Sequence, residues 1–267
     1  MKKLLFALLF GFVATTASAG TIDYLSTNTD PSTVQISDEL IGNNVQSTRL
    51  YALFNDFFQL TGDAAYTSSN ELYADRGLKG NIQHFTASEG AKMVSSFKSA
   101  GFASSLNFVD QSGNLLLNDD GTPVYSNYAA AGEDQRFKED LVDFPVVGEY
   151  SLQLDVWNPY EANGTHDLLY SNYALNPDGM INMLAIDVTD LIQAMYPDMV
   201  IDTAYLFTFE DRPSGGSYLD YDYQDYAFIA INVKPTLTPE PATAALFGLA
   251  LLGLPFARKL RRRNEIK

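Results

Sequence analysis

The sequence predicts a mainly β protein: an antiparallel β-sandwich or jelly-roll-like body with a few helices in the N-terminal third and a single C-terminal transmembrane helix. Three observations predict it. The 267 residues include 16 Tyr and 17 Phe, which favour the half-buried surface of a sheet. Apolar and polar residues alternate over 150–156, and similar segments are separated by Gly, Asn and Pro turns. No repeat of about 20 to 50 residues suggests a solenoid or propeller.

Two helices are expected in the first third. Residues 47–60 place apolar side chains three and four positions apart, which is the spacing of one helix face. The N-cap of this helix is expected at Ser47 or Thr48, and Gly62 lies just beyond its end. A second helix is expected over 88–100.

Strands are expected through the rest of the body. A hairpin is predicted through Asp119-Asp120-Gly121, because this tripeptide is typical of a turn. A short helix over 189–196 stops before Pro197. The charged stretch 133–143 is expected to be an exposed loop or a partial hinge. The expected strands are 102–109, 114–118, 122–126, 150–156, 181–188, 201–209 and 226–233.

The charge of the chain excludes one class of partner. The net charge is −16, and residues 20–238 alone hold nine Lys or Arg against 31 Asp or Glu, or 9 − 31 = −22. Such a surface repels nucleic acid and attracts cations. The chain has no Cys and only two histidines, His84 and His166. Thiol catalysis is therefore excluded, and a zinc or iron site would need unusual ligands.

The N-terminus has the three parts of a secretory signal peptide over residues 1–19. Two lysines come first, an apolar stretch of ten residues follows, and Ala17-Ser18-Ala19 supplies the small residues of a cleavage site. Ten apolar residues are too few to span a membrane. The predicted partners are the Sec translocon and signal peptidase, and cleavage after Ala19 leaves Gly20 as the first residue.

The C-terminus combines a Pro-rich linker (236–241), an uncharged apolar span (242–257) and a basic tail (258–267). As a helix, the span is about 24 Å long, and flanking arginines can extend its reach across the hydrocarbon layer. The positive-inside rule places these arginines in the cytoplasm and the acidic body outside the cytoplasm. They are Arg258, Arg261, Arg262 and Arg263.

Pro239-Glu240-Pro241, the apolar span and the terminal arginines together resemble a PEP-CTERM sorting tail. This resemblance implies recognition by an exosortase, removal of the tail, and release or attachment at the cell surface. It also implies a biofilm or exopolysaccharide setting in a bacterium with two membranes, with exopolysaccharide as a possible partner. The alternative is an ordinary C-terminal membrane anchor.

Five carboxylates lie within sixteen residues around Gly215-Gly216. Crowded anions repel one another unless a cation or hydrogen bonds compensate. Calcium suits them because it takes several hard oxygen ligands in flexible geometry. The other interpretation is a solvated acidic loop whose aspartates cap turns. The five candidate ligands are Glu210, Asp211, Asp220, Asp222 and Asp225.

The same segment resembles a second family, through Phe209-Glu210-Asp211 and Asp220-x-Asp222-Tyr223-x-Asp225. That family is a domain of unknown function found in exported bacterial surface proteins. Segments 100–114 and 169–182 also resemble it, so the likeness covers about 90–233 and implies one domain over 90–235. Residues 20–89 are then a helical and irregular region that packs on this domain. The family has no established activity to transfer.

No motif of an enzyme is present: there is no nucleophile elbow, no phosphate loop and no His-Glu-x-x-His. The sequence therefore predicts a non-enzymatic surface or extracellular-matrix protein whose acidic loop is a candidate calcium site. One alternative is a carbohydrate-binding adhesin, in which tyrosines form a stacking face for sugars. A weaker alternative is a secreted hydrolase that uses a pair of carboxylates. The four tyrosines considered are Tyr218, Tyr221, Tyr223 and Tyr226.

Overall fold

The computed structural model describes residues 34–38, 49–79, 82–97, 102–129, 141–158, 165–177, 179–211 and 221–237. The helices in these ranges are α2 (Leu50–Phe58), α3 (Ser69–Arg76) and α4 (Thr189–Met195), with 3-10 turns at Gly62–Ala64 and Tyr173–Leu175. The strands are β1 (Ile82–Phe97), β2 (Ala103–Val109), β3 (Ser126–Ala129), β4 (Leu141–Asp143), β5 (Gly148–Asn158), β6 (Thr165–Tyr170), β7 (Met183–Asp187), β8 (Ala204–Phe209) and β9 (Tyr226–Leu237).

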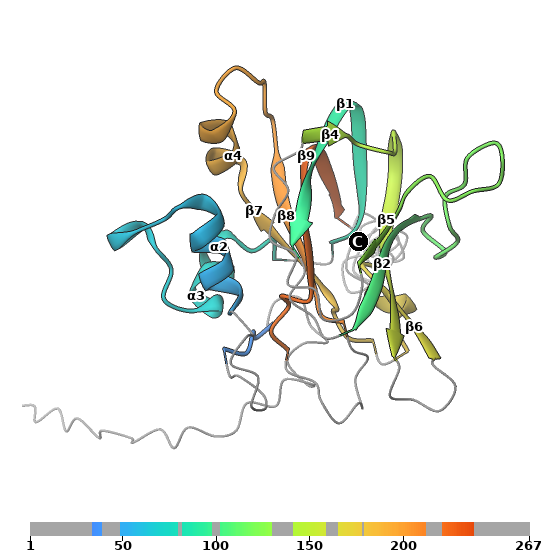
Figure 1. The fold of residues 1–267 in the computed structure, drawn as a ribbon, viewed down its shortest axis with the longest axis horizontal. Helices are drawn as coiled ribbons and strands as arrows, with labels where there is room; N and C mark the ends of the chain where they lie inside the picture. Colours follow the sequence, from blue (N-terminus) through green and yellow to red (C-terminus); the bar gives the residue numbers. More distant parts are fainter. Residues whose placement is uncertain are drawn as a thin grey trace, which may run out of the picture.

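These strands form one antiparallel sheet that curls over itself. Its order is β3-β2-β5-β1-β9-β8-β7, while β4 also pairs with β1 and β6 also pairs with β5. Strand β5 joins the two halves, because residues 148–150 pair with β1 and residues 151–157 pair with β2. In Figure 1 the half that contains β2, β5 and β6 lies on one side of β9, and the helices α2 and α3 lie on the other.

The first hydrophobic core lies between the two halves of the sheet. Side chains that alternate along each strand point into it, as expected for strands with one face toward a core. The rings of Phe85 and Phe207 meet edge to face with centroids 4.7 Å apart. This geometry is one that aromatic pairs prefer. Its largest buried members include Phe85, Phe108, Tyr150, Phe207, Phe209 and Phe228.

The second core covers the opposite face of β7, β8 and β9. The helices α2 and α3, the short segment 34–38 and α4 supply its other side. All six residues of β8 are buried, as are residues 226–231 of β9. Strands that are buried on both faces read as continuous apolar runs instead of alternating ones. The members include Leu50, Phe54, Leu72, Leu184, Leu206 and Ile229.

Local signals in the sequence set the helix α3, and one arginine attaches it to the body. The hydroxyl of Ser68 accepts a hydrogen bond from the Glu71 backbone N–H, which caps the first turn. The guanidinium of Arg76 donates to both carboxylate oxygens of Asp190 in α4, at 2.6 and 3.0 Å. This pair lowers the pKa of Asp190 and raises that of Arg76. Helix α3 is therefore tied to α4 across the sheet edge.

The predicted mainly β, antiparallel fold with few helices is confirmed. Strands were correctly expected at β2, β5, β7, β8 and β9, and helices at α2 and α4. The turn at Asp119-Asp120-Gly121 is present, but its flanks form only isolated bridges. Of the charged stretch 133–143, residues 141–143 form β4 and the rest lies outside the described residues.

Two helix predictions were wrong. Residues 88–97 belong to β1 instead of a helix, because this segment pairs with β9 on one side and β4 on the other. Met93 faces the first core and Val94 the second, so apolar residues on both faces of the strand produced a spacing similar to that of a helix. The N-cap of α2 is Arg49, without a side-chain cap, and not Ser47 or Thr48.

The predicted signal peptide (1–19), the linker (236–241, except residues 236 and 237 in β9), the apolar span (242–257) and the basic tail (258–267) lie outside the described residues. Across the ranges that the structure does describe, no helix has the length and apolar character needed to cross a lipid bilayer.

Replacing Phe207 tests the first core. Phe207→Ala removes a fully buried ring and is expected to lower the free energy of unfolding by about 3–5 kcal/mol. Val200→Ala is the matched control, because Val200 is 83% exposed and its truncation is expected to change stability by less than about 0.5 kcal/mol. Urea unfolding of both variants measures the difference, and equal losses would contradict the assigned core.

Candidate metal centre

Strand pairing between β8 and β9 places three carboxylates together. Phe209, the last residue of β8, lies opposite Tyr226, the first residue of β9. Glu210 directly follows the end of β8, and Asp225 directly precedes the start of β9. Asp211 comes after Glu210. The ladder continues through them, because the Asp225 N–H donates to the Phe209 carbonyl at 3.1 Å. Antiparallel register thus brings together Asp211 and Asp225, which are 14 positions apart in the sequence.

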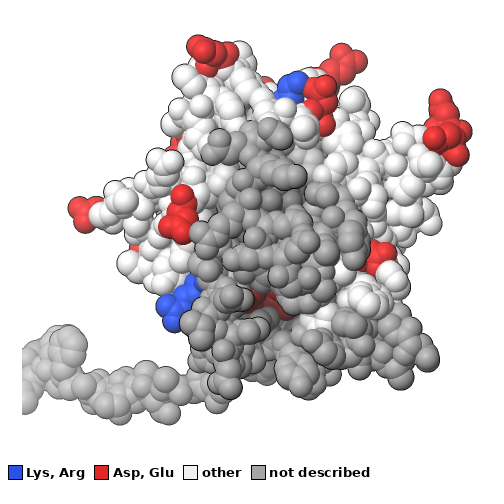
Figure 2. Space-filling model, in the orientation of Figure 1, with Lys and Arg blue, Asp and Glu red and all other residues white. Residues whose placement is uncertain are grey.

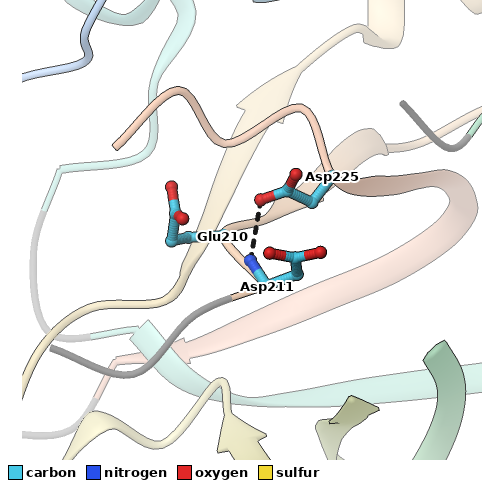
Figure 3. Close-up of side chains that lie close together, drawn as sticks. All are labelled: Glu210, Asp211 and Asp225. Atoms are coloured by element: carbon cyan, nitrogen blue, oxygen red, sulfur yellow. Dashed lines mark hydrogen bonds between the residues drawn. The ribbon is translucent and has the colours of Figure 1, made fainter. Parts of the chain in front are cut away.

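The three carboxylates converge closely. One oxygen from each of Glu210, Asp211 and Asp225 lies within 4.8 Å of the others. The backbone N–H of Asp211 donates to Oδ2 of Asp225 at 2.8 Å, and this bond holds the segment after β8 against the segment before β9 (Figure 3). The exposed fractions of the three residues are 0%, 4% and 7% in the same order.

Burial makes this cluster costly in the absence of a compensating charge. Carboxylates removed from water lose hydration, and like charges at such distances repel one another. A bound cation offsets both effects, and calcium accepts carboxylate and amide oxygens in flexible geometry. The donor set of this cluster is therefore the kind that a hard cation prefers.

An unsatisfied amide lies beside the cluster. The Glu210 N–H donates to the carbonyl of Asn182 at 3.0 Å, so Asn182 is the neighbour of Glu210 on the β7 side. Its side chain is fully buried, and neither its oxygen nor its nitrogen has a hydrogen-bond partner among the described residues. The same holds for Oε1 of the buried Gln224 within the described ranges. Buried polar atoms are normally paired, so these oxygens are suited to a ligand.

The structure brings together three of the five predicted ligands. Asp222 is buried near them in sequence, but its two oxygens accept hydrogen bonds from the side chain and backbone of Gln224 at 2.5 and 3.3 Å. Asp220 lies outside the described residues. No sequence pattern indicates a role for Asn182, because this residue becomes adjacent to Glu210 only through the pairing of β7 with β8.

The segment before β9 is held in an uncommon backbone conformation. Tyr221 and Tyr223 both have a φ of +55°, a region that non-glycine residues rarely adopt. The Tyr223 hydroxyl donates to the Ile181 carbonyl at 2.6 Å, and the Tyr221 carbonyl accepts from the Ser37 N–H at 2.9 Å. Strained backbone of this kind persists where surrounding contacts enforce it, often at functional sites. These contacts position Asp225 opposite Glu210.

The carbohydrate-binding alternative required tyrosines exposed on one face, and the described tyrosines do not form such a face. Tyr223 and Tyr226 are 0% and 1% exposed and belong to the second and first cores, respectively. Aromatic residues that alternate in this segment therefore serve packing. Tyr221 is half-buried against the second core, and Tyr218 lies outside the described residues.

Comparison with known proteins adds little. No known protein-family profile matches the sequence, and no curated protein matches it. Among solved structures, the chain is similar to the C-terminal domain of the BC2L-C lectin from Burkholderia cenocepacia, with a TM-score of 0.32 and 12% sequence identity. The match covers 56% of this chain and 94% of the lectin domain. A TM-score this low does not establish a common fold, so the match gives no information about a ligand.

The two histidines have different environments. His84 is buried, and its Nδ1 lies 2.5 Å from the hydroxyl oxygen of Ser151. Burial lowers the pKa of His84, because a charged imidazole loses hydration there. His166 is exposed, with its Nδ1 2.7 Å from Oδ1 of Asp155.

The lowered pKa of His84 predicts a pH-dependent stability. In the unfolded chain His84 binds a proton near its usual pKa of about 6.5, whereas the folded protein resists protonation. The neutral, buried His84 therefore contributes its full stability above about pH 6.5, and this stability is lost as the pH falls below the usual histidine pKa. We expect the fall in unfolding free energy between about pH 7.5 and about pH 5.5 to shrink in His84→Asn and to persist in Val200→Ala, which alters an exposed residue that does not titrate. Identical pH profiles for the two variants would contradict this assignment.

Proposed function

We propose that this chain is a non-enzymatic protein of the cell surface or extracellular matrix, and that a calcium ion completes its fold between β8 and β9. The observation that supports the proposal is the convergence of three buried carboxylates within 4.8 Å. Glu210, Asp211 and Asp225 are the residues to hold the ion, with backbone carbonyls and water as further oxygen ligands. The ion would neutralise most of their charge and hold the two strand ends together.

The proposed location outside the cytoplasm is compatible with a calcium site. Calcium sites in extracellular modules bind with dissociation constants of about 10⁻⁴ to 10⁻³ M, so a site with few protein ligands is sufficient there. The body carries a net charge of −22 between residues 20 and 238, which raises the local concentration of cations. Figure 2 shows Asp and Glu spread over the described surface, with Lys and Arg much rarer.

Export and sorting are proposed from the two ends of the sequence. A signal peptide over 1–19 directs the chain to the Sec translocon, and the tail from Pro239 onward presents it to an exosortase. The secreted hydrolase remains an alternative prediction, and no observation among the described residues favours it over a binding or structural role.

Calcium is expected to stabilise the protein against heat. At a calcium concentration about one hundred times the dissociation constant, linkage gives about 2.7 kcal/mol, which raises the unfolding temperature by about 5–10 °C. Glu210→Gln is expected to remove most of this shift and to unfold in chelator at or above the wild-type temperature, because it relieves repulsion. Asp202→Asn is the matched control. Asp202 is exposed and precedes the start of β8, whereas the three carboxylates lie beyond its other end.

Differential scanning fluorimetry with calcium, magnesium and chelator measures these temperatures. An unchanged wild-type transition in calcium would remove the metal from the proposal. A shift that survives in Glu210→Gln would move the ion to another place on the acidic surface.

The sorting proposal predicts two cleavage points. Mass spectrometry of the protein from its native cells is expected to find Gly20 at the N-terminus and no residues of the basic tail 258–267. Recovery of a soluble cytoplasmic chain with Met1 attached would contradict export. Recovery of the intact tail in the membrane would favour an ordinary anchor over exosortase processing.

A further inference from the structure

Asn182 lies directly before β7 and opposite Glu210 of the metal centre. Strand β7 pairs with β8 through Met183 and Phe209, and the Glu210 N–H donates to the Asn182 carbonyl at 3.0 Å, so the pairing continues by one residue. Directly opposite residues of an antiparallel pair have side chains on the same face, with Cβ atoms about 4.5–5.5 Å apart. The Asn182 amide and the Glu210 carboxylate are therefore neighbours on one face of the sheet.

That face is the side of the second core. Leu184, two residues after Asn182, belongs to the second core, and side chains two positions apart on a strand share a face. Tyr223 is buried in the same core, and its hydroxyl donates to the Ile181 carbonyl at 2.6 Å. The chain at Asn182 is thus held by Tyr223 through the preceding residue and by Glu210 directly, so the position of the amide is fixed.

The Asn182 amide lacks the partners that other buried amides have. Its side chain is 0% exposed, and both its oxygen and its nitrogen are unpaired within the part of the chain that the structure describes. By contrast, Asn107 donates to Oε1 of Gln153 at 3.2 Å, and the amide of Asn176 forms three hydrogen bonds with backbone atoms. An unpaired buried amide costs free energy that an apolar side chain avoids. A polar group at this position therefore indicates a ligand.

Calcium needs more oxygen ligands than the three carboxylates provide with one oxygen each. It takes about six to eight, and the converging oxygens of Glu210, Asp211 and Asp225 supply three of them (Figure 3). Because these residues are almost fully buried, little of the remainder is open to solvent. An amide oxygen adds a ligand without adding a fourth negative charge to the cluster.

We propose that Oδ1 of Asn182 is a fourth protein ligand of the ion, so that the metal centre joins β7 as well as β8 and β9. This inference rests on the proposed calcium site between β8 and β9. Strand β7 ends the strand order of the sheet, so the ion fastens an edge strand to its neighbours. The unpaired amide and the crowded carboxylates then have a common explanation.

Asn182→Leu separates a ligand from a structural amide. Leucine has the same branching at Cγ but no polar atom, so the variant is expected to bind calcium about tenfold or more weakly. In chelator it is expected to unfold at or above the wild-type temperature, because an unpaired buried group is removed. Differential scanning fluorimetry of the full chain over a calcium titration measures both quantities.

Asn107→Leu is the matched control, because it replaces a buried asparagine that has a partner. It leaves Gln153 without that partner, so it is expected to unfold at a lower temperature in chelator and to keep the wild-type calcium affinity. Wild-type calcium affinity in Asn182→Leu would overturn the inference, and a lower unfolding temperature in chelator beside it would assign the amide a structural role instead.

A second substitution decides the matter if Asn182→Leu does not fold. Asn182→Asp keeps an oxygen ligand and adds a charge, so it is expected to unfold at a lower temperature in chelator and to gain more from calcium than the wild type does. The absence of a calcium response in Asn182→Asp would overturn the inference.

Failure of this inference is distinguishable from failure of the proposed function. A wild-type chain that does not respond to calcium removes both. A wild-type response that Glu210→Gln abolishes and Asn182→Leu leaves intact removes Asn182 alone and retains the site between β8 and β9.

Discussion

Strand β8 and the first half of β9, residues 226–231, are buried on both faces, and the other elements pack around this pair. Phe207 and Phe228 face the core between the sheet halves, while Leu206 and Ile229 face the helical side. Strand β8 and residues 226–231 of β9 have no access to water, so they depend on the neighbouring strands for backbone hydrogen bonds. β1 and β7 supply these bonds at the outer edges of the pair. Two cores can therefore exist in one body of modest size.

The polar chemistry of the body is concentrated where this buried pair ends. Glu210 follows the last residue of β8, and Asp225 precedes the first residue of β9. The register that pairs Phe209 with Tyr226 therefore also places the carboxylates of Glu210 and Asp225 side by side. Contacts from Tyr223 and the segment 34–38 hold the incoming chain in place. The hydrophobic packing around the strand ends therefore holds the carboxylates in place. The same packing removes them from water, which costs free energy. A cation relieves that conflict without any change in the strands.

Much of this arrangement follows from the sequence, and the remainder depends on contacts between distant residues. The alternation in β5 and the apolar run of β9 identify strands, and the clustering of Glu210, Asp211 and Asp225 is visible along the chain. Strand β1 was missed because its two buried faces produce no period of two, and pairing with β9 overrides its local pattern. The burial of His84 against Ser151 and of Asn182 beside Glu210 arises only from register between strands remote in sequence.

A crystal structure of the protein grown with calcium tests the central claim most directly, because calcium gives an anomalous signal that water does not. The account predicts an anomalous peak at about 2.3–2.6 Å from carboxylate oxygens of Glu210, Asp211 and Asp225. Density for water alone at this place, with the Asn182 amide hydrogen-bonded to the acids, would contradict it.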